Sequence, residues 1–287
     1  MQYSDNPFAE TLTKIAQAAK EANPREDGDY TENGLLHCGK CHTPKETTVT
    51  LGGRETKVAC MCKCREEQAE AKRKKFIHDS RAEALKDSAY GDKALRNCCF
   101  ENDDGTNPEL TKKCRNYVEN FERFSESGKG LLFFGSCGTG KTYAALEIAN
   151  ALMEKLYSVK FATFAAIANE LFDNPEKQGY INRLAQDYDL LCIDDYAAER
   201  NTPWMNEQLF AVIDARCKAH KPLIVTTNLT RDEMFDRKNI DRYRICSRLM
   251  ELCIAVEVNG KDRRISDYIK NKAEFEDLLN QGKDKIQ

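Results

Sequence analysis

Residues 131–152, LLFFGSCGTGKTYAALEIANAL, join a short apolar run to a glycine-rich turn and then to a stretch with helical spacing. The turn from Gly135 to Thr142 fits the phosphate-loop pattern G-x-x-x-x-G-K-[ST], with the strand before it and the helix after it that the pattern requires. Glycines let successive backbone N–H groups point inward at an anion, and the positive N-terminus of the following helix faces the same phosphates. The alternative is a glycine-rich turn that binds nothing, which the flanking elements disfavour.

The phosphate-loop pattern assigns roles to the residues of the turn. We expect Lys141 to reach the β and γ phosphates of a nucleotide and Thr142 to hold Mg²⁺. The expected nucleotide-binding residues are Gly135, Ser136, Cys137, Gly138, Thr139, Gly140, Lys141, Thr142 and Tyr143.

Length and composition limit the rest of the molecule. A chain of 287 residues fits a domain of about 200 residues plus a smaller module. Charged residues make up 32% of the chain but the net charge is only −3, so any contact with nucleic acid must be a local patch. No apolar run reaches the roughly 18 residues of a membrane span, and the start lacks the form of a signal peptide, so we expect a cytoplasmic protein without membrane contact. Thirteen cysteines in that compartment favour reduced thiols or a metal over disulfides.

Residues 1–34 are predicted to be a short helix followed by a linker. Residues 7–20 place Phe8 and Leu12 on one helical stripe, which could dock on a partner or pack on its own protein. Residues 21–33 are acidic and turn-rich, as a linker is.

Residues 35–66 are predicted to form a zinc-ribbon-like module. A C-x-x-C pair is followed, after a further 18 residues, by a group of three cysteines, and the sequence between alternates like a hairpin that turns at Gly52-Gly53. Both cysteine groups could then meet at one end, as tetrahedral Zn²⁺ requires in a module too small to fold on its core alone. The expected ligands are Cys38, Cys41, Cys62 and Cys64, with Cys60, His37 and His42 as spares. Unpaired thiols and redox activity are the alternatives.

The remaining chain divides into three parts. Residues 67–105 are predicted to be a basic helical linker, in which KRKK at 72–75 either contacts phosphates or forms a solvated helix face. A second domain covers residues 106–264, and its first helix is expected over 108–126. Residues 265–287 form a tail whose apolar helical spacing could pack on the core.

Apolar strand-like runs recur in the second domain and alternate with helical spacing. After the run that precedes the phosphate loop, they cover residues 159–164, 189–195, 222–227 and 253–258. This alternation predicts an α/β fold, with a parallel sheet covered on both faces. Ligands of such sheets bind at the carboxyl ends of the strands, where the motif residues fall.

Polar side chains follow two of these strands. The run DLLCIDD ends in Asp194, which matches the Walker-B carboxylate that supports Mg²⁺, and Asp195, which is placed to orient or activate the attacking water. Asn228 follows the next strand and is suited to sense loss of the γ-phosphate. The alternatives are a purely structural strand end and an ordinary helix cap.

The predicted helix DRYRICSRLMELC, residues 241–253, carries Arg242, Arg244 and Arg248. An arginine that reaches a neighbouring subunit's nucleotide could stabilise the transition state and make hydrolysis depend on assembly. Arg248 is the expected finger and Arg244 the reserve, whereas other arginines form surface ion pairs.

With these motifs in order, the chain resembles the AAA+ ATPases of the DnaC/DnaI helicase-loader group over residues 35–264. The resemblance is carried by FENDDG, GSCGTGKTY, DLLCIDDYAAERNT, KPLIVTTNLT and RICSRLMELC, together with the cysteine module. It implies a five-stranded AAA+ P-loop core that binds and hydrolyses ATP and associates with itself. It also implies an N-terminal region that grips the hexameric replicative helicase, and an inserted helix within residues 164–187 that helps hold single-stranded DNA.

The chain departs from the group's pattern in two places. Ser136 stands where a proline is common, although only backbone geometry is required there. No full helical lid domain is expected after residue 258, so no second-sensor role is assigned to Arg263 or Arg264.

The sequence therefore favours an ATP-dependent loader of the replicative helicase onto single-stranded DNA. One alternative is an IstB-type transposition ATPase that delivers a transposase to target DNA, although such proteins usually lack a cysteine module. Another is a zinc-ribbon adaptor that binds nucleotide without turnover, against which the intact ATP-site residues argue.

Overall fold

The computed structural model describes residues 24–51, 54–90, 92–197 and 202–280. They form two compact units, of which the first ends at Asp79 and the second begins at Ser80. The helix expected within residues 7–20 lies outside the described residues.

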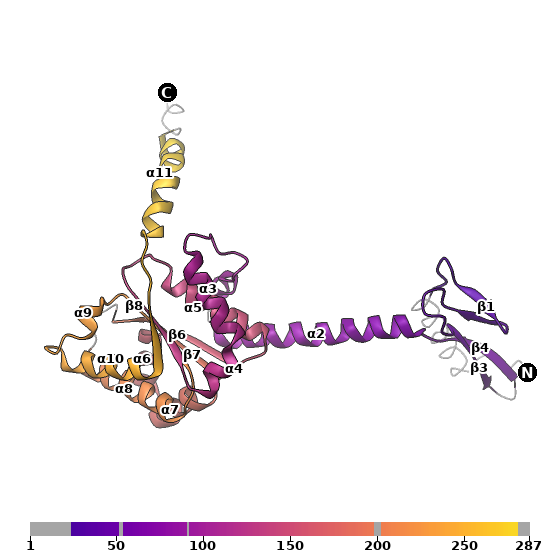
Figure 1. Ribbon diagram of the computed structural model, residues 1–287, viewed down its shortest axis with the longest axis horizontal. Coiled ribbons are helices and arrows are strands. Elements are labelled where there is room, and N and C mark those ends of the chain that lie inside the picture. Colours follow the sequence, from indigo (N-terminus) through magenta and orange to yellow (C-terminus); the bar gives the residue numbers. More distant parts are fainter. Residues whose placement is uncertain (1–23, 52–53, 91, 198–201, 281–287) are drawn as a thin grey trace, which may run out of the picture. The chain divides into compact units, whose positions relative to one another are not determined.

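The first unit contains two short antiparallel hairpins and the beginning of a long helix (Figure 1). The elements are β1 (Tyr30–Glu32), β2 (Leu35–His37), β3 (Glu46–Leu51), β4 (Arg54–Ala59) and α2 (Lys63–Ala89). Leu51 pairs with Arg54 across β3 and β4, which confirms the predicted hairpin. Almost every α2 residue of this unit is polar or exposed, as a solvated helix requires.

The stretch expected to be a linker, residues 21–33, contributes β1 and a buried ion pair to this unit. Lys45 Nζ lies 2.6 Å from Asp29 Oδ2, and each side chain is only 2% exposed. Asp29 also accepts hydrogen bonds from the backbone N–H groups of Glu26 and Gly39. Asp29, one of the acidic residues on which the linker prediction is based, is therefore a buried carboxylate with hydrogen-bond and ion-pair partners in the folded unit.

A five-stranded parallel sheet forms the centre of the second unit, in the order β6-β7-β8-β5-β9. The strands are β5 (Gly130–Phe134), β6 (Val159–Thr163), β7 (Leu190–Tyr196), β8 (Leu223–Thr227) and β9 (Cys253–Glu257). The last four agree with the predicted runs to within one residue at each end. The predicted α/β fold with a five-stranded parallel sheet is confirmed.

Helices cover both faces of the sheet because neighbouring strand residues point to opposite sides. In β5, Leu132 joins the apolar cluster under one set of helices, and Phe133 joins the cluster under the other. The first set is α6 (Phe164–Asp173), α7 (Lys177–Gln186), α8 (Pro203–Lys218) and α10 (Ile240–Leu252), and the second is α3 (Pro108–Glu119), α4 (Phe121–Glu126) and α5 (Lys141–Glu154). The shorter elements are η1 (Lys93–Asn97) and α9 (Arg231–Met234), and α11 (Arg263–Asn280) follows the sheet.

Two expected helices are each divided in two. The helix predicted over 108–126 breaks at Asn120, whose side chain bonds back to the carbonyl of Asn116. The helix expected within 164–187 breaks before Pro175, because a proline disfavours helical geometry in the residue that precedes it.

The packing of the tail on the core is not observed. Ile265, Tyr268, Ile269, Phe275 and Leu279 of α11 are exposed by 58–79%. The helical spacing of the tail is confirmed, but in the described structure nothing covers these five side chains.

Candidate functional site

The phosphate loop connects β5 to α5 at the carboxyl end of the sheet. Gly138 has a φ of 70°, which favours glycine. A Cβ on Gly138 would lie 2.0 Å from Asp262 Oδ1, so a side chain there would displace the Asp262 carboxylate. The phosphate loop is therefore in close contact with the segment around Asp262, which lies 124 residues later in the chain.

Lys141 and Thr142 begin α5 and face two different partners. The Lys141 ammonium is buried and donates to the carbonyls of Gly135 and Ser136, at 2.9 and 2.6 Å. Burial lowers its pKa, which is the expected cost of holding a cation there for a phosphate. Thr142 Oγ1 donates to Asp194 Oδ1 at 3.0 Å. This hydroxyl and carboxylate are oxygen donors that fit Mg²⁺.

Asp194 and Asp195 lie at the end of β7 but differ in environment. Asp194 is buried and accepts a second hydrogen bond, from Thr226 Oγ1 at 2.5 Å, and burial raises its pKa. Asp195 is exposed, with a φ of 56°, and the pairing of β7 with β8 is irregular between Ile193 and Tyr196. A left-handed residue at a strand end is a strained conformation of the kind that clusters at functional sites.

Thr226 connects both acids, a role that the sequence did not predict. The backbone N–H of Asp195 donates to Thr226 Oγ1 at 3.0 Å, and that hydroxyl donates to Asp194. Asn228 follows directly after β8, which lies between β7 and β5. The strand order therefore brings Asn228 to the edge of the sheet that carries the phosphate loop and the two acids.

The predicted arginine finger has partners within its own chain. Arg248 forms ion pairs with Asp214 and Glu251. Arg244 instead stacks over the Phe210 ring at 4.8 Å and lines a pocket with Asp241. To act as a finger, Arg248 would have to break its ion pairs with two carboxylates. Among the interactions described for Arg244, only the contact with the Phe210 ring would be lost.

Two further segments lie against the phosphate loop, and local sequence patterns do not signal either. The backbone N–H of Arg263 donates to the carbonyl of Gly138 at 3.0 Å, and its guanidinium lies 3.2 Å from Asp104. Tyr143 Oη donates to the carbonyl of Cys99 at 3.2 Å. Contacts of this range depend on the tertiary fold, so no motif spacing predicts them.

Glu147 lies one turn beyond Tyr143 on α5 and is buried without full hydrogen bonding. Its side chain is 2% exposed, and Oε1 has no hydrogen-bond partner among the described residues. Burial, assisted by the negative charge of Asp103, raises the pKa of Glu147 from 4.5 to about 7. The folded protein therefore binds a proton here more tightly than the unfolded chain.

This shift predicts a stability that falls as pH rises from about 4.5 to about 7. Glu147→Gln removes the ionisable group and should raise the free energy of unfolding at pH 8 by about 2 kcal/mol, with little gain at pH 5. Urea unfolding followed by the fluorescence of Trp204, the only tryptophan, reports on this unit alone. Glu119→Gln, at an exposed position of α3 in the same unit, is the control, and an equal gain at both pH values would contradict the assignment.

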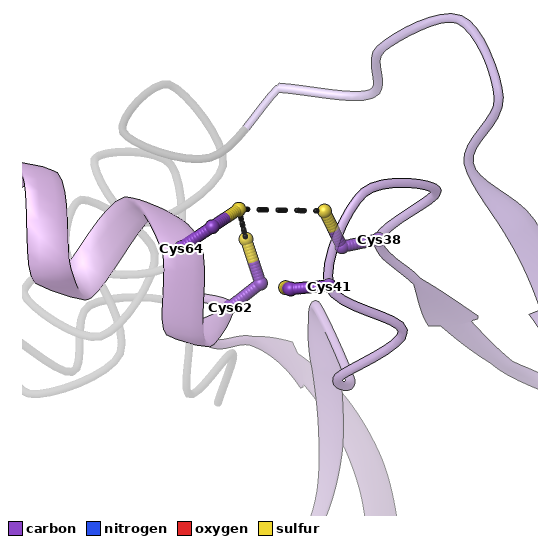
Figure 2. Close-up of side chains that lie close together, drawn as sticks. All are labelled: Cys38, Cys41, Cys62 and Cys64. Atoms are coloured by element: carbon purple, nitrogen blue, oxygen red, sulfur yellow. Dashed lines mark hydrogen bonds between the residues drawn. The ribbon is translucent and has the colours of Figure 1, made fainter.

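The four predicted zinc ligands lie together in the first unit. Figure 2 shows Cys38 and Cys41 on the turn after β2, facing Cys62, which directly precedes α2, and Cys64 in its first turn. Their sulfurs all lie within 4.8 Å of one another, and Cys64 Sγ is 3.7 Å from Cys38 Sγ and 3.5 Å from Cys62 Sγ. Tetrahedral Zn²⁺ with Zn–S bonds of about 2.3 Å places its sulfurs about 3.8 Å apart. The cluster therefore fits Zn²⁺.

Backbone geometry also prepares the cluster for a cation. The backbone N–H groups of Cys41 and Lys40 donate to the Cys38 sulfur and lower the pKa of its thiol, which favours the thiolate that a metal requires. A Cβ on Gly39 would lie 2.3 Å from the carbonyl oxygen of Gly28, so this tight turn requires glycine.

The spare ligands lie outside the cluster. Cys60 Sγ donates to the carbonyl of Pro44 at 3.5 Å. His37 stacks on the Tyr30 ring, with centroids 5.6 Å apart, and His42 approaches the same ring at 5.8 Å. Ligation by these three residues would require the loops to rearrange.

Comparisons with known proteins agree with this geometry. The family model described as IstB-like ATP binding protein matches residues 60–271. The replicative helicase loader DnaI of Bacillus subtilis (strain 168) is 24% identical over 206 residues, which cover 67% of this chain and 66% of that protein. The replicative helicase loader DnaC of Escherichia coli (strain K12) is 30% identical over 162 residues, which cover 52% and 64%. The chain thus spans slightly less than two thirds of the length of these two relatives.

A crystal structure of DnaI aligns with a TM-score of 0.49 and 24% sequence identity, covering 61% of this chain and 95% of that one. Among the described residues, no helix combines the length and the apolar composition needed to span a bilayer.

Proposed function

Because the chain belongs to the IstB-like ATP-binding protein family, we propose that it is an ATP-dependent loader that places a hexameric replicative helicase on single-stranded DNA. The observation that supports the proposal most directly is the assembly of Lys141, Thr142, Asp194 and Asp195 at one end of the sheet, in a distant relative of two helicase loaders. In this proposal the first unit holds Zn²⁺ and the helicase, and the second binds and hydrolyses ATP in the cytoplasm.

Each residue of the ATP site has a role in the proposal. Bound Mg²⁺ supplies positive charge to the β and γ phosphates. Lys141 exchanges its loop carbonyls for the same phosphates, and Thr142 and Asp194 hold the ion through their oxygens. Asp195 orients the attacking water, and Asn228 contacts the γ-phosphate. Loss of that contact after hydrolysis changes the protein's grip on its partners.

A surface on the divided insert supports contact with single-stranded DNA. Phe172, at the end of α6, is 70% exposed and meets the Trp204 ring edge-on, with centroids 5.7 Å apart. Lys177 lies over the Trp204 ring at 5.5 Å. An exposed ring beside a cation can stack a base and attract the phosphate backbone without a dense basic stripe.

Phe172→Ala should therefore weaken binding of a fluorescent oligothymidine about ten-fold in the presence of ATP, because one stacked base is lost. Fluorescence anisotropy measures the affinity. Phe235→Ala, a partly exposed ring elsewhere on the same unit, should change nothing. Equal affinities for the Phe172 variant and the unmodified protein would remove this surface from the proposal.

The loader proposal is tested by partner capture from a cell extract with ATP, using the full chain and mass spectrometry. We expect the intact protein and the Cys60→Ser variant to recover a replicative helicase and the Cys62→Ser variant to lose it. Of these two cysteines, Cys62 belongs to the four-cysteine cluster and Cys60 does not. A helicase absent from every capture would refute the loading role.

The second candidate is delivery of a transposase to target DNA, and the family to which the chain belongs is the observation that favours it. Recovery of a transposase in the same capture would replace the loader with this function. The ATP site serves both functions equally.

A further inference from the structure

The α11 helix presents an apolar stripe with no partner among the described residues. Ile265, Tyr268, Phe275 and Leu279 repeat at spacings of three, seven and four residues, which places them on one side of a helix. All four are at least 58% exposed. An amphipathic helix of 18 residues with its apolar side in water is typical of an interaction element.

An apolar groove lies on the edge strand of the sheet. It has a volume of about 650 Å³ and is floored by Tyr117, Leu131 and Val256, beside Ile254, which is 49% exposed. β9 pairs only with β5, so its other edge is available in the described structure. The charged side chains of the rim are Lys113 and Arg123, both exposed and without an ion pair among the described residues.

The stripe and the groove are complementary in charge as well as in polarity. The second half of α11 contains EFED at residues 274–277, and Glu276 is exposed with only a long contact of 3.5 Å to Lys272. The groove rim is basic. Apolar surface can therefore meet apolar surface while acidic side chains meet basic ones.

The chain's own α11 is poorly placed to fill the groove, because the segment before it is fixed at both ends. The Val258 N–H donates to the Phe134 carbonyl at 2.8 Å, and the Arg263 N–H donates to the Gly138 carbonyl. These bonds hold the start of α11 at the phosphate loop, beyond the carboxyl end of β9. The groove is lined instead by Ile254–Val256 within that strand.

We propose that α11 of one copy of this chain docks into the groove between β9 and α3–α4 of a second copy. The stripe and the groove are different surfaces, so the contact is heterologous and can repeat from subunit to subunit. This inference concerns self-association only and does not depend on the loader role.

A charge-exchange experiment on the full chain tests the contact. Arg123→Glu and Glu276→Arg should each weaken self-association about ten-fold in sedimentation velocity over a dilution series. An equimolar mixture of the two variants should recover association, because the reversed helix of one fits the reversed groove of the other. Phe275→Ser should weaken association, whereas Phe76→Ser, which alters another exposed phenylalanine, should not.

The other occupants give distinct results. Recovery in the double variant but not in the mixture would place α11 in its own groove. Sensitivity to Phe275→Ser without sensitivity to Arg123→Glu would mean that α11 helices pair with each other or with a different protein. Association that ignores all of these changes, or that is absent, would also overturn the proposal. Trp204 fluorescence verifies that the variants of the second unit are folded, and limited proteolysis verifies the fold of Phe76→Ser in the first unit.

Discussion

Asp195→Ala should lower the rate of ATP hydrolysis by about 100-fold or more and leave the affinity for ATP nearly unchanged. Asp195 is exposed, while Asp194 is the acid that bonds to Thr142. The substitution therefore removes the group proposed to position or activate water, and it leaves in place the oxygens proposed to hold Mg²⁺. Loss of such a group typically costs a factor of this size. Phosphate release under saturating ATP measures the rate, and a fluorescent ATP analogue measures the affinity.

Two companion variants make this result interpretable. Lys141→Ala should weaken ATP binding about 100-fold and hydrolysis with it, because the buried charge proposed to contact the phosphates is lost. Asp187→Ala alters an exposed acid at the end of α7 and should preserve both rate and affinity. Normal hydrolysis by Asp195→Ala would show that another group orients the water.

Cys62→Ser should abolish the proposed binding of Zn²⁺ to the first unit and unfold that unit. Structural Zn²⁺ contributes on the order of 10 kcal/mol to folding in small modules, and this unit otherwise has two short hairpins and a solvated helix. Inductively coupled plasma spectrometry measures the bound zinc. Limited proteolysis measures folding, with cleavage expected throughout the first unit while the second unit remains intact.

Cys60→Ser is the matched control, because Cys60 is only two residues away but outside the four-cysteine cluster. It should retain one zinc per chain and the protease resistance of the unmodified protein. Zinc lost from Cys60→Ser and retained by Cys62→Ser would show that the loop rearranges around a different set of sulfurs.

Local patterns predicted the parts of the site that local chemistry determines. The phosphate loop needs glycines, a lysine and a threonine at fixed spacing, and the strands need apolar runs, so both are visible in the sequence. The preference for Cys62 and Cys64 over Cys60 agrees with the cluster that the fold assembles.

The parts that sequence could not predict depend on contacts between distant segments or on backbone detail. Arg263 reaches the phosphate loop through the path of the chain after β9, and the left-handed geometry of Asp195 depends on an irregular strand pairing. Asp29 is assigned from sequence to an acidic linker because no local pattern predicts its ion pair with Lys45, which lies 16 residues later.

The hydrogen bond from the Arg263 N–H to the Gly138 carbonyl joins the first residue of α11 to the loop proposed to cradle the phosphates. A nucleotide that altered this loop would therefore act on the residue at which α11 begins. If ATP changes the affinity of α11 for its partner, thermodynamic reciprocity requires that binding of this partner to α11 changes the affinity for ATP by the same factor. Docking of α11 at the edge of the sheet and binding of ATP at its carboxyl end would then be thermodynamically linked.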